Sequence, residues 1–353
     1  MPKDFARLVA VTAALASALA GALFVDLAAG SATAVMSPAP VNVAASAHPG
    51  AGPTVLSRRP LYPLPAAPAR PEPCALGPNA NLPSRALLAS HGLSMKPVAG
   101  PLAARHLNPL PVMGKGIWIT DFPGQPVSVP AVISLARRTG LSQLWVRVGS
   151  THDGFYGGPL LKALVPRAHA RGIHVVAWDF PTLVNPAADA ARARQALADG
   201  VDAFSPDIET PAEGTDLTVG RVTAYLSRVR AIAGPRPVVA TVPDPLSGQL
   251  VSYPYAAEAP VVDAFAPMVY WSCTEPGAAV ANAVSVLSHL RPVVPIGQDY
   301  NMASEGGRVG LPSGREIWRF LNVAARAGAI GASLYDLESG GPVQLKALAA
   351  YPW

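Results

Sequence analysis

Two carboxylic acids lie two residues apart in the segment Ser205-Pro-Asp207-Ile-Glu209. In an extended strand, residues two apart project from the same face, so Ser205, Asp207 and Glu209 are expected to point the same way. Two half-buried carboxyls this close cannot both ionise at low cost, and one of them keeps its proton near neutral pH. Cleavage of a glycosidic bond requires such a pair, because the leaving oxygen must be protonated while positive charge develops at the sugar carbon. A structural carboxylate pair, hydrogen-bonded to neighbouring loops, is the alternative.

The elements that would position this pair are short apolar segments, each followed by a helix-like stretch. They begin roughly 30 residues apart, which fits one strand, one helix and two short loops per unit. Continuous apolar strands must be covered on both faces, as in an all-parallel sheet sheathed in helices. The pattern predicts an α/β fold, a (β/α)8 TIM barrel, whose active sites lie at the carboxyl ends of its strands. The eight predicted strands are residues 116–122, 144–150, 173–181, 201–209, 237–244, 262–271, 292–299 and 330–338.

Helix start signals separate these strands. Ser128 and Asn185 are predicted N-caps with a proline close behind, and Ser313 with Glu316 predicts a capping box. A glycine follows each of the three helical segments. The polar, glycine-rich loop of residues 151–158 is either a mobile flap over the barrel mouth or an ordinary surface turn.

Other polar residues stand at the predicted strand ends. Asp121 and Asp179 are candidate substrate ligands or second carboxylates, with loop capping as the alternative, and Gln298 is a candidate for binding a sugar hydroxyl. Arg147 lies in the middle of a strand and needs a carboxylate partner if it points inward. An interior ion pair with Asp207 or Asp179 is expected for it rather than a substrate contact.

The segment Asp202-Ala-Phe-Ser205-Pro-Asp207-Ile-Glu209 resembles the fourth-strand motif DxxDxDxE of family 18 glycoside hydrolases, the chitinase-like enzymes. Three of the four acidic positions of the motif match. Residues 267–271 (PMVYW) are similar to the MxYD or MxYN segment of that family. The resemblance covers the barrel at the level of the fold, and sequence motifs match at only three strands.

Two further features belong to this resemblance. The eighth predicted strand ends in Leu334-Tyr335-Asp336, where the family usually places a sugar-stacking Trp. The Asp-x-Glu pair also looks like that of the family 25 lysozymes, in which an Asp at the end of the first strand completes the site. Asp121 would fill that place.

The resemblance implies a role for each matching residue. Glu209 would be the proton donor, and Asp207 would orient and stabilise a 2-acetamido group that acts as internal nucleophile. Tyr270 would hydrogen-bond that group, and Trp271 or Tyr335 would form the floor under the sugar ring. Without a 2-acetamido group on the substrate, a second carboxylate such as Asp121 or Asp179 would have to serve.

Three departures from the family pattern weaken the implied chitinase-type turnover. Ser205 replaces an acidic residue, Trp271 replaces the expected Asp or Asn, and Tyr335 replaces the stacking Trp. The same fold family contains sugar-binding proteins that have lost catalysis. The predicted function is therefore an exported glycoside hydrolase acting on a polysaccharide such as peptidoglycan or chitin, and the alternative is a non-catalytic carbohydrate-binding barrel of the cell envelope.

No cofactor and no metal site are expected, because the His residues are scattered and no Cys/His grouping has zinc-site spacing. A phosphate-handling barrel is a third interpretation, which the glycine pairs at 306–307 and 340–341 support only loosely. The net charge of +5 is a weak basic bias that would favour anionic wall polymers. No basic stripe interleaved with aromatic residues is present, so nucleic acid is not an expected partner.

The chain before the barrel has a different composition. Residues 1–34 combine a basic start, an apolar run and a small-residue exit, which predicts a signal peptide, with a membrane anchor over residues 8–25 as the alternative. Residues 35–112 are dominated by Ala and Pro and predict a disordered spacer. The barrel would occupy residues 113–353, and the protein would be secreted or associated with the cell envelope. Cys74 and Cys273 either form a disulfide that pins the spacer across the barrel mouth or stay as two thiols.

Overall fold

The computed structural model describes residues 110–120, 127–245 and 253–353. The predicted leader (1–34), nearly all of the predicted spacer (35–112) and Asp121 lie outside the described residues. Within the described ranges, no helix is both long and apolar enough to cross a membrane.

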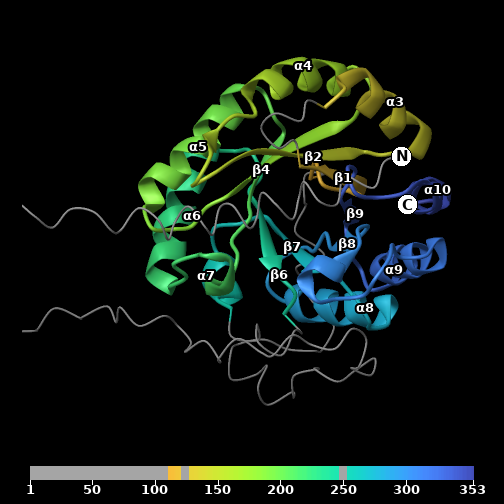
Figure 1. Cartoon of the computed structure of the whole chain (residues 1–353). Helices are drawn as coiled ribbons and strands as arrows, with labels where there is room; N and C mark the ends of the chain where they lie inside the picture. The colour runs from red at the N-terminus through yellow and green to blue at the C-terminus, as the bar shows by residue number, and fades with distance from the viewer. Residues whose placement is uncertain (1–109, 121–126, 246–252) are drawn as a thin grey trace, which may run out of the picture. The chain divides into compact units, whose positions relative to one another are not determined.

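Eight parallel strands form one sheet around a central axis, in the neighbour order β5-β4-β2-β1-β9-β8-β7-β6 (Figure 1). The two end strands meet through the bridges Phe204–Val238 and Asp207–Thr241, which close the sheet into a barrel. Each of the eight predicted strands is present, and the TIM-barrel prediction is confirmed. The strands are β1 (Gly114–Ile119), β2 (Gln143–Ser150), β4 (His174–Phe180), β5 (Ala203–Pro206), β6 (Val239–Pro243), β7 (Ala264–Val269), β8 (Ile296–Gln298) and β9 (Gly331–Tyr335).

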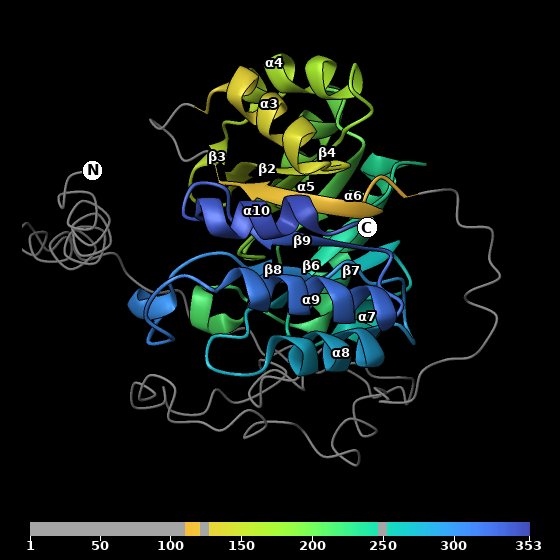
Figure 2. The same ribbon diagram turned by 90° about the vertical axis from the view of Figure 1, so that its right-hand side faces the viewer.

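Helices surround the strands in both views (Figures 1 and 2). Two predicted caps form as expected: Asn185 accepts a hydrogen bond from the backbone of Ala188, and Ser313 with Glu316 makes a capping box. Ser128 occupies the N-cap position without a side-chain hydrogen bond. The helices are α3 (Val129–Thr139), α4 (Gly158–His169), α5 (Pro186–Ala198), α6 (Val219–Ala233), α7 (Tyr255–Glu258), α8 (Pro276–Leu287), α9 (Gly314–Arg326) and α10 (Pro342–Ala350), with two 3-10 turns, η2 (Pro211–Glu213) and η3 (Met302–Glu305).

Side chains fill the barrel interior. Trp118 on β1 stacks on Trp145 of β2, with ring centroids 4.7 Å apart, and also contacts Trp178 of β4 at 5.1 Å. The Trp118 indole nitrogen donates to Ser333 Oγ of the neighbouring strand β9. The interior is therefore a packed core, and the strand ends above it are where a site can form.

The loop of residues 151–158 folds back on the barrel. Its short strand β3 (Gly154–Phe155) pairs antiparallel with the end of β2. The backbone N–H groups of Tyr156 and Gly157 both donate to the Val148 carbonyl. The loop is thus a hairpin that extends β2 beyond the barrel wall.

Candidate functional site

Asp207 and Glu209 follow β5 directly, at the carboxyl end of the barrel. The Asp207 side chain is 8% exposed, and its Oδ1 atom has no hydrogen-bond partner among the described residues. The Asp207 backbone is fixed on both sides, because its N–H donates to the Asp179 carbonyl of β4 and the residue bridges to Thr241 of β6. Glu209 is half-buried. An almost buried carboxyl and a half-buried one therefore lie together at the end of one strand.

Burial raises the pKa of both carboxyls. The pKa of Asp207 rises to about 7, and the charges of Asp179 and Glu213 add to that rise, whereas Arg147 opposes it. The pKa of Glu209 lies well above its usual range because of burial and then the charges of Asp207, Glu213 and Glu305. Burial and the charges of three neighbouring carboxyls thus favour the protonated form of Glu209, which is the form that a general acid needs.

Tyrosine rings gather beside this pair. Tyr270 follows β7, Tyr335 ends β9 and Tyr300 follows β8, and their ring centroids lie 5.5–5.8 Å apart. All three are half-buried, and the charges of Asp207 and Glu209 both raise the pKa of Tyr270. The barrel thus brings Tyr270 and Tyr335, two predicted site residues, to the carboxyl pair. Tyr300 was missed because the predicted seventh strand ended one residue before it.

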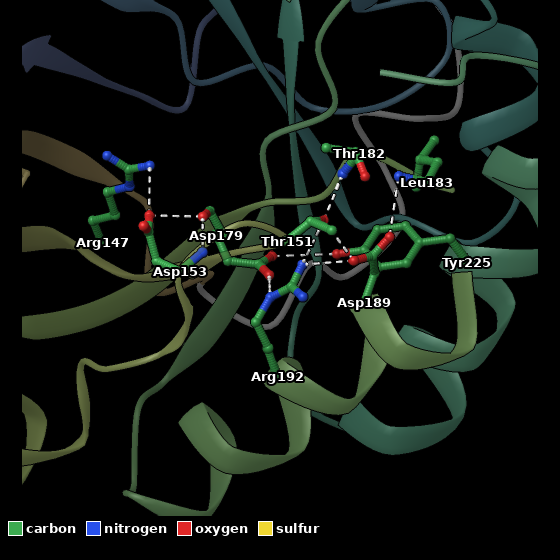
Figure 3. Close-up of polar contacts among 10 residues, drawn as sticks. Arg147, Thr151, Asp153, Asp179, Thr182, Leu183, Asp189, Arg192 and Tyr225 are labelled. Carbon is green, nitrogen blue, oxygen red and sulfur yellow. Dashed lines mark hydrogen bonds and ion pairs between the residues drawn. The ribbon is translucent and has the colours of Figure 1, made fainter. Parts of the chain in front are cut away.

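Two other predicted site residues face the helices. Asp179 is fully buried, and its carboxylate accepts from Arg192 Nε of α5 at 2.5 Å and from the Tyr225 hydroxyl of α6 at 3.3 Å (Figure 3). Trp271 is 2% exposed and packs on Phe320 of α9, with ring centroids 5.3 Å apart. A substrate contact would require these side chains to face the mouth, whereas both form part of the layer between the barrel and its helices.

Gln298 ends β8 and is fully buried. Its side-chain oxygen accepts from the backbone N–H of Ser272 at 2.8 Å, and its amide nitrogen donates to the Tyr300 carbonyl at 3.0 Å. The amide thus joins the end of β8 to the loop after β7. In this arrangement it positions Tyr300, and its substrate contact stays a prediction. Asp121 lies outside the described residues, so its predicted role is untested.

Arg147 points into the mouth from β2, but its ion-pair partner differs from the expected Asp207 or Asp179. Its guanidinium lies 4.0 Å from the Asp153 carboxylate of the β2–β3 hairpin (Figure 3). It also lies 5.4 Å from the centre of the Trp178 ring. Asp153 sits in the loop that follows β2, where the hairpin returns it toward Arg147.

Ser205, which occupies an acidic position of the family motif, joins two strands. Its hydroxyl donates to the Val239 carbonyl at 2.6 Å and lies 2.8 Å from Thr241 Oγ1. Both partners belong to β6. A serine here therefore links β5 to β6 directly beneath the carboxyl pair.

Cys273, in the loop after β7, is disulfide-bonded, and Cys74 lies outside the described residues. Across the part of the chain that the structure describes, no three His, Cys, Asp or Glu side chains come together as a metal site would require.

No family model and no curated protein matches this sequence. Solved structures do match its fold. A chitinase from Chromobacterium violaceum superimposes with a TM-score of 0.50 at 11% identity, over 67% of this chain and 98% of the chitinase. The spore cortex-lytic enzyme SleL from Bacillus megaterium superimposes with a TM-score of 0.50 at 10% identity, over 67% of this chain and 73% of SleL. The similarity to chitinase-like barrels that the strand motifs predicted is thus confirmed at the level of the fold.

Proposed function

We propose that this protein is a glycoside hydrolase that acts on a polysaccharide of N-acetylated amino sugars, with Glu209 as general acid and base. The observation that carries the proposal is the placement of Asp207 and Glu209 together at the carboxyl end of β5, where burial and the charge of Asp207 raise the pKa of Glu209. The names of the two structural neighbours, a chitinase and a spore cortex-lytic enzyme, favour chitin or peptidoglycan as the substrate. The proposal includes export through residues 1–34, which place the enzyme outside the cell or at its envelope.

The proposed reaction begins when Glu209 donates its proton to the glycosidic oxygen while the bond from that oxygen to the sugar carbon breaks. The carbonyl oxygen of the 2-acetamido group, oriented by Asp207 and Tyr270, attacks the same carbon. Glu209, now ionised, takes a proton from the water that opens this intermediate, so the configuration is retained. Tyr335 forms the floor under the sugar. A substrate without the acetamido group would need a second carboxylate in the mouth, and Asp179 faces away from it.

The test compares wild type, Glu209→Gln and Glu213→Gln on labelled chitin and peptidoglycan oligosaccharides. Glu209→Gln keeps the shape of the side chain but cannot donate the proton, so turnover should fall by about 10²–10⁴-fold while binding is retained. Glu213 is exposed on η2 and serves as the control: removing its charge weakens the rise in the pKa of Glu209 but leaves the proton donor in place, so turnover is expected within a few-fold of wild type. Oligosaccharides that bind without being cleaved by wild type would identify a carbohydrate-binding barrel instead. Absence of both binding and cleavage would refute the proposal.

A further inference from the structure

A chain of buried polar groups lies on the helix side of the β5 end. Glu258 of α7 is fully buried, Tyr253 is 4% exposed, and Ile208 is fully buried between Asp207 and Glu209. The Tyr253 hydroxyl oxygen lies 2.9 Å from the Ile208 carbonyl oxygen and 2.8 Å from Glu258 Oε1. One hydroxyl therefore joins a buried acid to the peptide bond that precedes Glu209.

The number of protons available to Glu258, Tyr253 and the Ile208 carbonyl decides the direction of the hydrogen bonds among them. A tyrosine hydroxyl has one hydrogen, and the Ile208 carbonyl can only accept. Each contact can therefore have a hydrogen atom of its own only if Glu258 is neutral and donates its proton to the Tyr253 oxygen. Burial supports this state, since it raises the pKa of Glu258 to about 8.

The peptide between Ile208 and Glu209 determines where the Glu209 side chain begins. The Ile208 N–H donates to the Thr241 carbonyl of β6 at 3.2 Å, so the amide end of Ile208 is also held. The charge of Glu209 in turn raises the pKa of Tyr253, so the two side chains lie within electrostatic reach. The Ile208 carbonyl is thus the point at which the outer layer of the barrel holds the Glu209 backbone.

We propose that Glu258 and Tyr253 form a positioning relay, in which neutral Glu258 donates to Tyr253 and Tyr253 donates to the Ile208 carbonyl, holding Glu209 in place. When Glu258 loses its proton to solvent, it becomes an acceptor and the single Tyr253 hydrogen turns toward it. The Ile208 carbonyl then loses its donor. The consequence for turnover rests on the proposed function, whereas the relay itself does not.

The charged and titratable groups that face this relay come from three elements. Tyr255 packs on Tyr253 from the same segment, with ring centroids 4.7 Å apart, and donates its hydroxyl to the Pro243 carbonyl at 2.8 Å. Glu209 faces Tyr253 from the end of β5, and Asp244 faces Tyr255 from the end of β6. Burial raises the pKa of Glu258, and its hydrogen bond with Tyr253 opposes that rise.

One nuclear magnetic resonance signal can report on the relay directly. Ile208-Glu209 is the only Ile-Glu pair in the sequence. Labelling the full chain with carbonyl-13C isoleucine and 15N glutamate therefore gives a single correlated signal from this peptide. In wild type this signal should shift with a transition near pH 8, where Glu258 ionises. Glu258→Gln keeps a donor to Tyr253 but does not titrate, so the transition should disappear.

Tyr253→Phe should also abolish the transition, because it breaks the relay at its middle. Tyr255→Phe is the matched control: it removes a neighbouring buried hydroxyl that holds β6 instead of β5, and the transition should stay. If Tyr253→Phe fails to fold, Glu258→Gln decides alone. A transition of the same size and midpoint in Glu258→Gln and wild type would overturn the relay, since it would then come from Glu209 itself.

Turnover gives a separate measurement. The ratio of turnover at pH 9 to turnover at pH 7 is measured for each protein. This ratio should be several-fold higher in Glu258→Gln than in wild type. If wild type hydrolyses no substrate, the labelled peptide still tests the relay, and the proposed function alone fails. If hydrolysis occurs but the labelled peptide behaves alike in both proteins, the relay alone fails.

Discussion

At the scale of single residues, opposing influences act on the Asp207 carboxyl. Burial raises its pKa to about 7, whereas the positive charge of Arg147 lowers it. Arg147 is held over Trp178 and next to Asp153, so its charge stays close to the pair. The protonation of Asp207 near neutral pH therefore depends on a side chain from a different strand.

Arg147→Gln should move the acidic limb of the kcat/KM profile to higher pH. Asp207 must be ionised to orient the acetamido group, and without the cation its pKa rises further, by up to about one unit. Turnover would then fall at a higher pH on acidification. The control is Arg194→Gln, because Arg194 is exposed on α5. An acidic limb that stays in place or moves to lower pH would contradict the assignment.

At the scale of elements, a buried network joins β4 to α5. Arg192 bonds Asp179 of β4, and its Nη2 atom donates to Asp189 one turn earlier on α5 at 3.0 Å (Figure 3). Asp189 accepts from Thr151 at 2.6 Å, which ties the loop after β2 into the network. Each of these charges is compensated inside the layer, so removing one partner leaves the other buried without compensation.

Arg192→Met should destabilise the protein by about 3–5 kcal/mol at pH 8, measured by urea unfolding. Arg194→Met changes an exposed arginine on the same helix and should cost at most about 0.5 kcal/mol.

The pH dependence of this loss follows from Asp179. Its folded-state pKa is raised from 3.8 to about 6, so its contribution to stability is complete below pH 3.8 and is lost as the pH rises through 6. Without Arg192 that pKa rises further, and the cost of the substitution should be smaller at pH 5 than at pH 8. Equal costs at both pH values would contradict the ion pair.

At the scale of the whole molecule, the barrel closes between β5 and β6. This seam consists of isolated bridges and backbone bonds, among them Phe204 N–H to the Pro237 carbonyl at 3.1 Å. Ser205 adds two side-chain contacts to β6. Because the carboxyl pair follows β5, the closure of the whole barrel also places the site.

Ser205→Ala should loosen this seam. We expect a loss of about 1 kcal/mol in stability and faster hydrogen exchange of the Ile208 amide, which donates to the Thr241 carbonyl. Ser142→Ala is the matched control, because the Ser142 hydroxyl also donates to a backbone carbonyl, that of Met113 at 2.6 Å, but away from the seam. Exchange at Ile208 that is equally fast in both variants would show that Ser205 has no special part in closure.

Local sequence was enough to predict the strands, two of the helix caps and the acid pair. These features depend on the period of apolar residues or on contacts three residues apart, as in the Ser313–Glu316 capping box. Alternation along a strand also separates Tyr270 from Trp271 and Trp178 from Asp179, since adjacent residues face opposite sides. This alternation was therefore a signal that Trp271 and Asp179 face the helices.

Only the tertiary structure decided which distant side chains meet. The tyrosine cluster needs three strands side by side, and Tyr253 reaches Ile208 only because α7 packs outside the barrel. The sequence alone determined the chemistry available at the strand ends, because residue type and strand period are local properties. Barrel closure determined the partners and the burial of each carboxyl, and hence its pKa, because these depend on residues tens of positions apart.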